Sequence, residues 1–325
     1  MLINFLFSQL DRLHLILYIS YYSSRQAVSE KGVCHESIFF ALKMDWLVSD
    51  LEISNQNNSP TLFNKDGTAY KTYGAFSHTL IFVHGVGMCG DIWEPQVEFF
   101  AKKYQVVTYD FLGHGQTPLT TEVPQLDDYV EQLNILVNSL NISKFLLVGH
   151  SMGALISIAY TLKYPHKILS LVPLNIVFNR NKKAHEIAVK RAENILNANK
   201  ILNINQTIER WFKNKTRPKD LKKIDKVLSI LKKTSPKGYG EAYRIFALSD
   251  KVFMSTLSEM QPPVLYLTGS EDPNSTPLMS EQMSQKTPGS SSNSIEGEAH
   301  MMAYISADKI NPIIEQFFIN TGTNT

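Results

Sequence analysis

A serine between two glycines is the strongest chemical signal in this chain. Residues 149–153 read Gly-His-Ser-Met-Gly, so Ser151 stands at the centre of a Gly-x-Ser-x-Gly motif. An apolar run over 145–148 precedes the motif, and a helix-like pattern over 152–164 follows it. A serine on such a strand-to-helix turn is held above the edge of a sheet, and flanking glycines let the backbone pass close by. We therefore predict that Ser151 is a nucleophile.

A serine hydroxyl needs a general base to take its proton. Of the nine histidines, His300 has the best context, in Glu-Ala-His-Met-Met between the last expected strand and the last expected helix. We predict that His300 is this base. His84, His114 and His150 lie in or beside other loops of the same sheet edge, and we expect them to pack or to bond to loop backbone.

The base in turn needs a carboxylate that fixes its tautomer and stabilises the imidazolium. Asp272 follows the apolar run 263–267 in the sequence Leu-Thr-Gly-Ser-Glu-Asp-Pro. Glu271 is the alternative, but a strand end usually directs only one of two adjacent side chains into a site. The sequence favours Asp272, which gives the chain order Ser, Asp, His that is expected for a nucleophile on this kind of turn.

Acyl transfer places negative charge on the former carbonyl oxygen, and two backbone N–H groups typically stabilise it. We expect one from Met152, directly after the nucleophile, and the other from Val86, in the loop after the run 79–83. Cys89 lies nearby without a base and is expected to be a packed thiol. No motif calls for a metal or an organic cofactor.

These residues fall between alternating strand and helix patterns. Expected strands cover residues 61–64, 68–73, 79–83, 105–109, 145–148, 168–174, 263–267 and 292–295, and expected helices cover residues 91–103, 126–140, 152–164 and 307–318. A further helix is expected to start at Pro277. This alternation is typical of an α/β fold with a mostly parallel sheet covered by helices on both faces.

Residues 178–260 break the alternation and carry helical spacing without a strand-like run. The sequence thus predicts core residues 61–177, a helical cap over 178–260 above the carboxyl ends of the strands, and core residues 261–325. The cap carries 19 Lys and Arg against 8 Asp and Glu, whereas the whole chain has a net charge of only +2. A solvated helix surface explains such an excess, but so does attraction of an anionic substrate.

Bulk composition fits a soluble globular chain, with 43% hydrophobic and 19% charged residues among 325. Two cysteines without a Cys-x-x-Cys pair favour a reducing, cytoplasmic setting. Residues 1–60 lie outside the strand–helix pattern, and Met44 is a possible alternative start. Charged side chains interrupt the apolar run near the N-terminus, so we expect no stable membrane insertion, although a weak interfacial anchor stays open. Nothing points to nucleic acid.

Four blocks occur in order: HGVGMCGDIW, YDFLGHGQT, VGHSMG and LTGSEDPNSTP with a later EAHMM. Together they resemble the α/β-hydrolase family over about 61–318. The segments IERWF at 208–212 and GYGEAYR at 238–244 make the branch of 3-oxoadipate enol-lactonases and small carboxylesterases the most similar one. The resemblance implies a cofactor-free serine hydrolase that cleaves an ester or lactone through an acyl-enzyme.

Other reactions remain compatible with the same three residues: carbon–carbon bond hydrolysis, lyase chemistry, acyl transfer, or a slow ligand receptor. The substrate is expected to be a small ester or lactone, and an anionic one if the cap charge faces the entrance. Arg180, Arg210 and Arg244 are candidates to hold its carboxylate, because a guanidinium can form two parallel hydrogen bonds with it. Arg244 is the first choice, since it lies in the segment that resembles the lactonase cap. The oligomeric state is left open.

Overall fold

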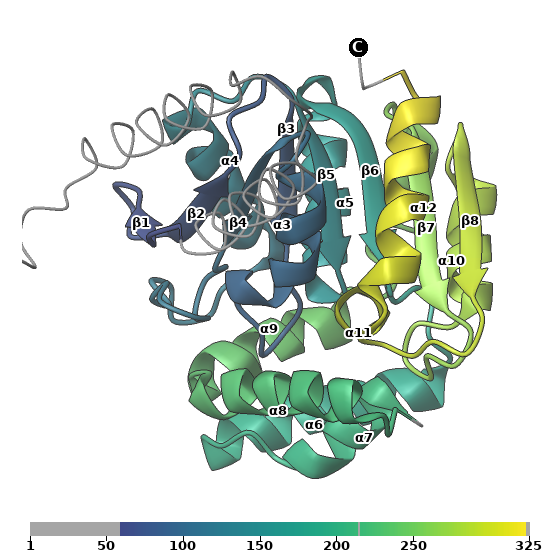
Figure 1. Cartoon of the computed structure of the whole chain (residues 1–325). Helices are drawn as coiled ribbons and strands as arrows, with labels where there is room; N and C mark the ends of the chain where they lie inside the picture. The colour runs from purple at the N-terminus through teal and green to yellow at the C-terminus, as the bar shows by residue number, and fades with distance from the viewer. Residues whose placement is uncertain (1–58, 214, 323–325) are drawn as a thin grey trace, which may run out of the picture. The chain divides into compact units, whose positions relative to one another are not determined.

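The structure, a computed structural model, describes residues 59–213 and 215–322, and an eight-stranded sheet forms the centre of this part (Figure 1). The strand order is β1-β2-β4-β3-β5-β6-β7-β8. β1 and β2 pair antiparallel with their neighbours, and all the other pairs are parallel. The strands are β1 (Leu62–Phe63), β2 (Ala69–Tyr73), β3 (Thr79–Val83), β4 (Gln105–Tyr109), β5 (Phe145–His150), β6 (Ile168–Leu174), β7 (Val264–Gly269) and β8 (Ser290–Ile295).

The central strands are mostly apolar, as expected where helices cover both faces of a sheet. Every residue of β3 and β5 is buried, and Ile81 of β3 pairs with Val107 of β4 and Leu147 of β5. Continuous apolar strands of this kind are expected where a parallel sheet is enclosed on both sides. β8 differs, since most of its serine-rich residues are exposed at the sheet edge. A polar edge strand resists pairing with other chains.

Helices lie on both faces of the sheet. α3 (Glu94–Phe100), α11 (Met302–Ile305) and α12 (Ala307–Asn320) cover the front in Figure 1, and α4 (Leu126–Ser139), α5 (Met152–Lys163) and α10 (Pro277–Lys286) cover the back. Short 3₁₀ turns span Gly90–Trp93, Pro165–Lys167 and Leu257–Glu259. The predicted mostly parallel sheet with helices on both faces is confirmed.

Four helices separate β6 from β7 and lie beyond the carboxyl ends of the strands (Figure 1). They are α6 (Lys182–Ala198), α7 (Ile204–Phe212), α8 (Pro218–Lys233) and α9 (Pro236–Leu248). Side chains of Asn181 and Ser235 accept hydrogen bonds from the first turns of α6 and α9, which is the usual way to start a helix. We call residues 178–260 the helical insertion; its role as a cap domain stays a prediction.

Most expected elements lie within two or three residues of their observed bounds. The largest change concerns the expected helix 91–103, which is a 3₁₀ turn followed by the shorter α3. Pro95 lies near the start of α3. Gly74 has a left-handed φ and packs against the backbone of Ala101 and Tyr104, just after the early end of α3. The expectations for residues 1–58 lie outside the described residues. No helix in the described part is long and apolar enough to cross a membrane.

Candidate active site

Ser151 occupies a strained turn between β5 and α5. Its φ of 57° and ψ of −114° lie in a region that non-glycine residues rarely adopt, which is typical of a nucleophile on a sharp strand-to-helix turn. The flanking glycines are required by space. A Cβ atom at Gly149 would lie 2.3 Å from the Gly153 carbonyl oxygen, and one at Gly153 would lie 2.2 Å from the Val83 carbonyl oxygen.

Asp272 and His300 meet at the carboxyl ends of β7 and β8. Asp272 Oδ2 accepts a hydrogen bond of 2.7 Å from His300 Nδ1, and both residues are buried. Burial alone would raise the pKa of Asp272, but the charge and hydrogen bond of His300, together with the N–H of Asn274, lower that pKa below its ordinary value. The carboxylate therefore stays ionised and holds Nε2 of His300 free to accept a proton.

The two adjacent acidic residues have different surroundings. The Glu271 side chain is about one-third exposed and lies 3.4 Å from Lys213 Nζ at the surface. Its backbone N–H bonds to the Glu298 carbonyl, and its carboxylate forms no hydrogen bond or ion pair with His300 among the described residues. Asp272 is the carboxylate that contacts the histidine, as the sequence favoured.

Ser151 and His300 line one pocket together with side chains of α7 and α9. Trp211 of α7 stacks on the His300 ring with centroids 6.0 Å apart. Among residues 59–213 and 215–322, no hydrogen bond joins Ser151 Oγ to His300; such contacts often tighten only when substrate binds. The cavity beside these residues has a volume of about 30 Å³, which is room for a water molecule or two.

Val86 and Met152 both lie beside Ser151. Val86 lines the same pocket as Ser151, and Met152 is the first residue of α5. No described residue accepts a hydrogen bond from the N–H of either one. Gly87, by contrast, donates its N–H to His114 Nε2 at 2.9 Å. The N–H groups of Val86 and Met152 thus have no acceptor in the described part of the chain, and their role as oxyanion donors stays a prediction.

His84 and His114 support the loop that carries Val86. His84 Nδ1 donates to the Gly85 carbonyl at 2.8 Å, while its Nε2 accepts the N–H of Phe111. Burial lowers the pKa of His114 to about 4 and holds the pKa of His84 well below its ordinary value, where the charge of His114 adds to the effect. Both rings are therefore neutral at pH 7, and their expected bonding to loop backbone matches these contacts.

His150 lines the pocket beside the nucleophile. Its Nε2 donates to the His300 carbonyl at 2.8 Å, and the two rings lie 4.8 Å apart. Burial, followed by the charge of His300, lowers the pKa of His150 to about 3, so this ring is neutral. The neutral His150 fixes the backbone of the His300 loop and adds no charge to it.

The structure does not bring Arg244 to the pocket. Its Nε donates to Glu241 at 2.8 Å and its Nη2 donates to the Pro124 carbonyl at 2.6 Å, because it lies on the side of α9 that faces the loop before α4. Arg180 is also occupied, with bonds to carbonyls at the end of α9. Arg210 of α7 lines the pocket instead. Its neighbour Arg191 of α6 was not singled out by sequence.

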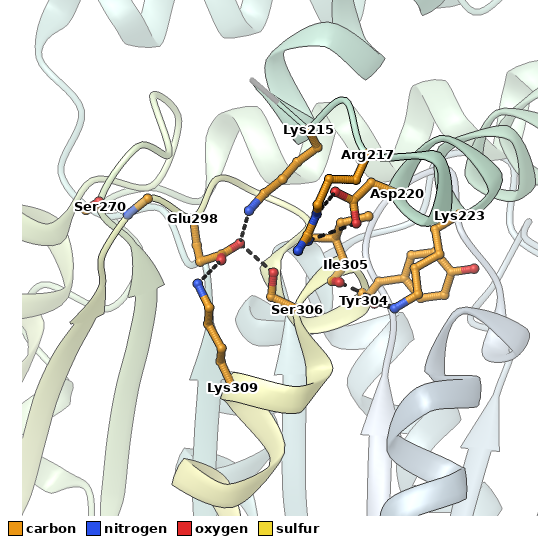
Figure 2. A network of polar contacts seen from close by, with 11 residues as sticks. Lys215, Arg217, Asp220, Lys223, Ser270, Glu298, Tyr304, Ile305, Ser306 and Lys309 are labelled. Atoms are coloured by element: carbon orange, nitrogen blue, oxygen red, sulfur yellow. Dashed lines mark hydrogen bonds and ion pairs between the residues drawn. The ribbon is translucent and has the colours of Figure 1, made fainter.

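The loop before His300 is tied to the helical insertion by charge (Figure 2). Glu298 is fully buried and accepts bonds from Lys215 of the insertion at 2.9 Å, Lys309 of α12 at 2.7 Å and Ser306 at 2.8 Å. Another lysine of the insertion, Lys223 of α8, donates to the carbonyls of Tyr304 and Ile305 in α11. Glu298 lies two residues before His300, so these contacts help to fix the segment that carries the histidine.

Asn175 is a site residue that sequence reasoning missed. It follows β6, has a left-handed φ of 50°, and donates its side-chain N–H to Asp272 Oδ2 at 2.9 Å. Ser275 Oγ bonds to the Asn175 carbonyl at 2.7 Å, which ties the Asp272 loop to β6. Its position at the carboxyl end of a predicted strand, the edge shared by Ser151 and Asp272, was the available signal.

Known proteins resemble this chain in sequence and in fold. The sequence model of one family, described as alpha/beta hydrolase fold, matches residues 78–306. The (E)-2-((N-methylformamido)methylene)succinate hydrolase of Acinetobacter baylyi is 34% identical over 74% of this chain and 90% of its own length. The 3-oxoadipate enol-lactonase 1 of the same organism is 29% identical over 63% of this chain and 76% of its own length.

The solved structures agree on the fold. The enol-lactonase from Burkholderia xenovorans superimposes with a TM-score of 0.70 at 19% identity, covering 80% of this chain and all of that one. At this identity the likeness concerns the fold alone. The resemblance to α/β hydrolases, an enol-lactonase among them, is confirmed by the family match and by both relatives. The chain belongs to the α/β-hydrolase fold family and is a hydrolase.

Proposed function

We propose that this protein is a serine hydrolase that cleaves a small carboxylic acid derivative through an acyl-enzyme. Ser151 Oγ attacks the substrate carbonyl carbon while His300 Nε2 takes the hydroxyl proton. The N–H groups of Val86 and Met152 stabilise the resulting oxyanion. The tetrahedral intermediate expels its leaving group, which receives the proton from His300, and Ser151 is left acylated.

The second half of the reaction repeats these roles with water. His300 removes a proton from a water molecule, whose oxygen attacks the acyl carbon. The serine ester bond then breaks, Ser151 recovers its proton from His300, and the carboxylic acid leaves. Asp272 remains ionised throughout and stabilises the imidazolium of His300.

One observation carries the proposal: the buried Asp272–His300 pair, joined by a bond of 2.7 Å, places His300 in the wall of the pocket that the strained Ser151 also lines. A packed core histidine would explain the pair but not the strained serine. Backbone strain at a non-glycine residue persists only where the surrounding structure enforces it, and it concentrates at functional sites.

The bond to be cleaved is proposed as an ester or a lactone. The enol-lactonase relative supports this choice. The substrate in the name of the other relative contains a formamido group, so acyl transfer from nitrogen is the second candidate. Both bonds place a carbonyl carbon before Ser151 and use the same residues, and they differ in how much the leaving group depends on a proton from His300.

A fluorophosphonate probe and a small substrate panel test this proposal. The wild-type protein should be labelled at Ser151 and should hydrolyse 4-nitrophenyl acetate, a simple lactone or a formamide with multiple turnovers. Ser151→Ala should abolish labelling and lower kcat by about 10³-fold or more with an unchanged melting temperature. A folded Ser151→Ala protein with near wild-type turnover would exclude Ser151 as nucleophile. Labelling followed by a single turnover would favour the slow receptor.

A further inference from the structure

Two guanidinium groups near the pocket have no acidic partner. Arg191 of α6 and Arg210 of α7 form no ion pair with any residue of the described chain. The Nε atoms of both are buried and lack a hydrogen-bond acceptor there. A buried donor without a partner costs free energy, and a charged donor costs more than a neutral one.

The other three arginines of the helical insertion are compensated. Arg217 and Arg244 bond to carboxylates of Asp220 and Glu241 at 2.6 and 2.8 Å. Arg180 bonds to two backbone carbonyls and lies near Asp250, whose charge favours its protonated form. The lack of a partner is therefore specific to the two arginines nearest the pocket and does not follow from the basic composition of the insertion.

The charges of the two arginines disfavour each other, and the charge of Asp272 offsets only part of this at Arg210. Burial lowers the pKa of Arg210, and the charge of Arg191 lowers it further. A guanidinium nevertheless stays protonated at any pH of interest. An anion between the two groups would relieve both the repulsion and the missing hydrogen bonds.

One of the two groups lines the pocket that holds Ser151, and the other contacts residues of its wall. Arg210 lines it directly. Arg191 Nη2 donates to Thr207 Oγ1 at 2.7 Å, and its guanidinium lies 5.3 Å from the centre of the Tyr243 ring. Thr207 and Tyr243 both line this pocket, so the tip of Arg191 lies directly behind its wall.

We propose that Arg191 and Arg210 form a carboxylate subsite, so that the hydrolysed substrate carries a free carboxylate beside its reacting carbonyl group. The planar fork of a guanidinium matches a carboxylate with two parallel hydrogen bonds. This inference rests on the proposed function for its catalytic meaning, but anion binding can be measured without any reaction.

The test measures binding of succinate, a small dicarboxylate, by titration calorimetry, with neutral succinamide as the isosteric control. Wild-type protein should bind succinate more tightly than succinamide. Arg210→Gln and Arg191→Gln should each weaken succinate binding by about tenfold or more, because a charge-assisted bond is lost. Arg210→Lys should recover part of that affinity, since the charge returns without the planar fork.

Lys183→Gln is the matched control, because it removes one positive charge from exposed α6 without touching the pocket. Its affinity should stay within about twofold of wild type. The subsite is overturned if succinamide binds as tightly as succinate, or if Lys183→Gln weakens binding as much as Arg210→Gln. Melting curves identify a variant that fails to fold. If Arg210→Gln does not fold, the succinate affinities of Arg210→Lys and Arg191→Gln test the subsite instead.

Hydrolysis of neutral 4-nitrophenyl acetate separates the two proposals. Succinate binding that depends on the arginines, without any Ser151-dependent hydrolysis, would support the subsite and reject the enzyme. Hydrolysis without succinate preference would support the enzyme and reject the subsite. A kcat/KM for 4-nitrophenyl hydrogen succinate above that of 4-nitrophenyl 4-methylpentanoate, lost in Arg210→Gln, would support both.

Discussion

At the scale of single residues, position decides the role of chemically equal groups. Glu271 and Asp272 are neighbours in sequence, yet one lies at the surface near Lys213 and the other is 2% exposed against His300. The difference follows from the turn after β7, where the Glu271 N–H bonds to the Glu298 carbonyl. Successive side chains then point to opposite sides of the turn.

Substitution of each acidic residue tests this assignment. Asp272→Asn should lower kcat by about 10³- to 10⁴-fold, since an amide no longer holds the required tautomer of His300. Glu271→Gln should change kcat by less than about threefold, because it removes only a surface ion pair. Steady-state kinetics on an activated ester provide the measurement. A larger loss of kcat in Glu271→Gln than in Asp272→Asn, at equal melting temperature, would show that Glu271 and not Asp272 orients His300.

At the scale of elements, the helical insertion and the sheet meet through the segment that carries His300. Glu298 of that segment forms ion pairs with Lys215 of the insertion and Lys309 of α12. The Trp211 carbonyl at the end of α7 also accepts the N–H of Met301. The end of α7 is thus bonded directly to the loop that carries His300.

The two lysines allow a matched comparison. Lys215→Gln removes the contact from the insertion, whereas Lys309→Gln removes an equivalent contact within the core. If the insertion positions His300, Lys215→Gln should lower kcat by about tenfold while Lys309→Gln has a smaller effect. Pre-steady-state acylation with an activated ester reports the step directly. Equal losses of kcat in both variants would contradict a special role of the insertion in positioning His300 and would leave Glu298 with a role in stability alone.

Glu298 also predicts how stability depends on pH. Burial would raise its pKa, but hydrogen bonds from Lys309, Lys215 and Ser306 lower it below the ordinary value. A folded-state pKa below the unfolded one contributes stability above the unfolded pKa of about 4.3, and this contribution is lost as the pH falls through the folded pKa.

Glu298→Gln should therefore destabilise the protein by about 1–3 kcal/mol at pH 7 and by less below pH of about 4. Urea unfolding of both proteins across a pH series measures the difference. A constant difference between pH 7 and pH 3.5 would contradict the predicted linkage.

At the scale of the whole molecule, every group proposed for catalysis lies within residues 78–306, the range matched by the family. The sheet, its flanking helices and the pocket are all built from residues 59–213 and 215–322.

Removal of residues 1–43 should leave a folded protein whose kcat/KM lies within about threefold of the full chain, since terminal segments outside the core usually tolerate truncation. Circular dichroism and ester kinetics compare the two forms. Aggregation or loss of activity on truncation would assign the segment a part in folding or in substrate access.

The sequence determined the fold class and the positions of Ser151, Asp272 and His300 because these features are local. A strand end, a turn with glycines and a following helix all lie within a few residues of each group. The carboxyl ends of parallel strands meet at one edge, so motifs that follow successive strands converge. The elbow, both candidate oxyanion donors and the favoured carboxylate were all accessible in this way.

Only the tertiary structure decided which arginine reaches the pocket. Helical spacing shows which residues share a face, but not what that face packs against. Arg244 bonds to Glu241 and a distant carbonyl, whereas Arg210 lines the pocket and Arg191 of α6 bonds to Thr207 in the pocket wall. The burial of Glu298 and the contact of Asn175 with Asp272 likewise join residues that lie far apart in sequence. Such contacts depend on the packing of whole elements, which no local pattern encodes.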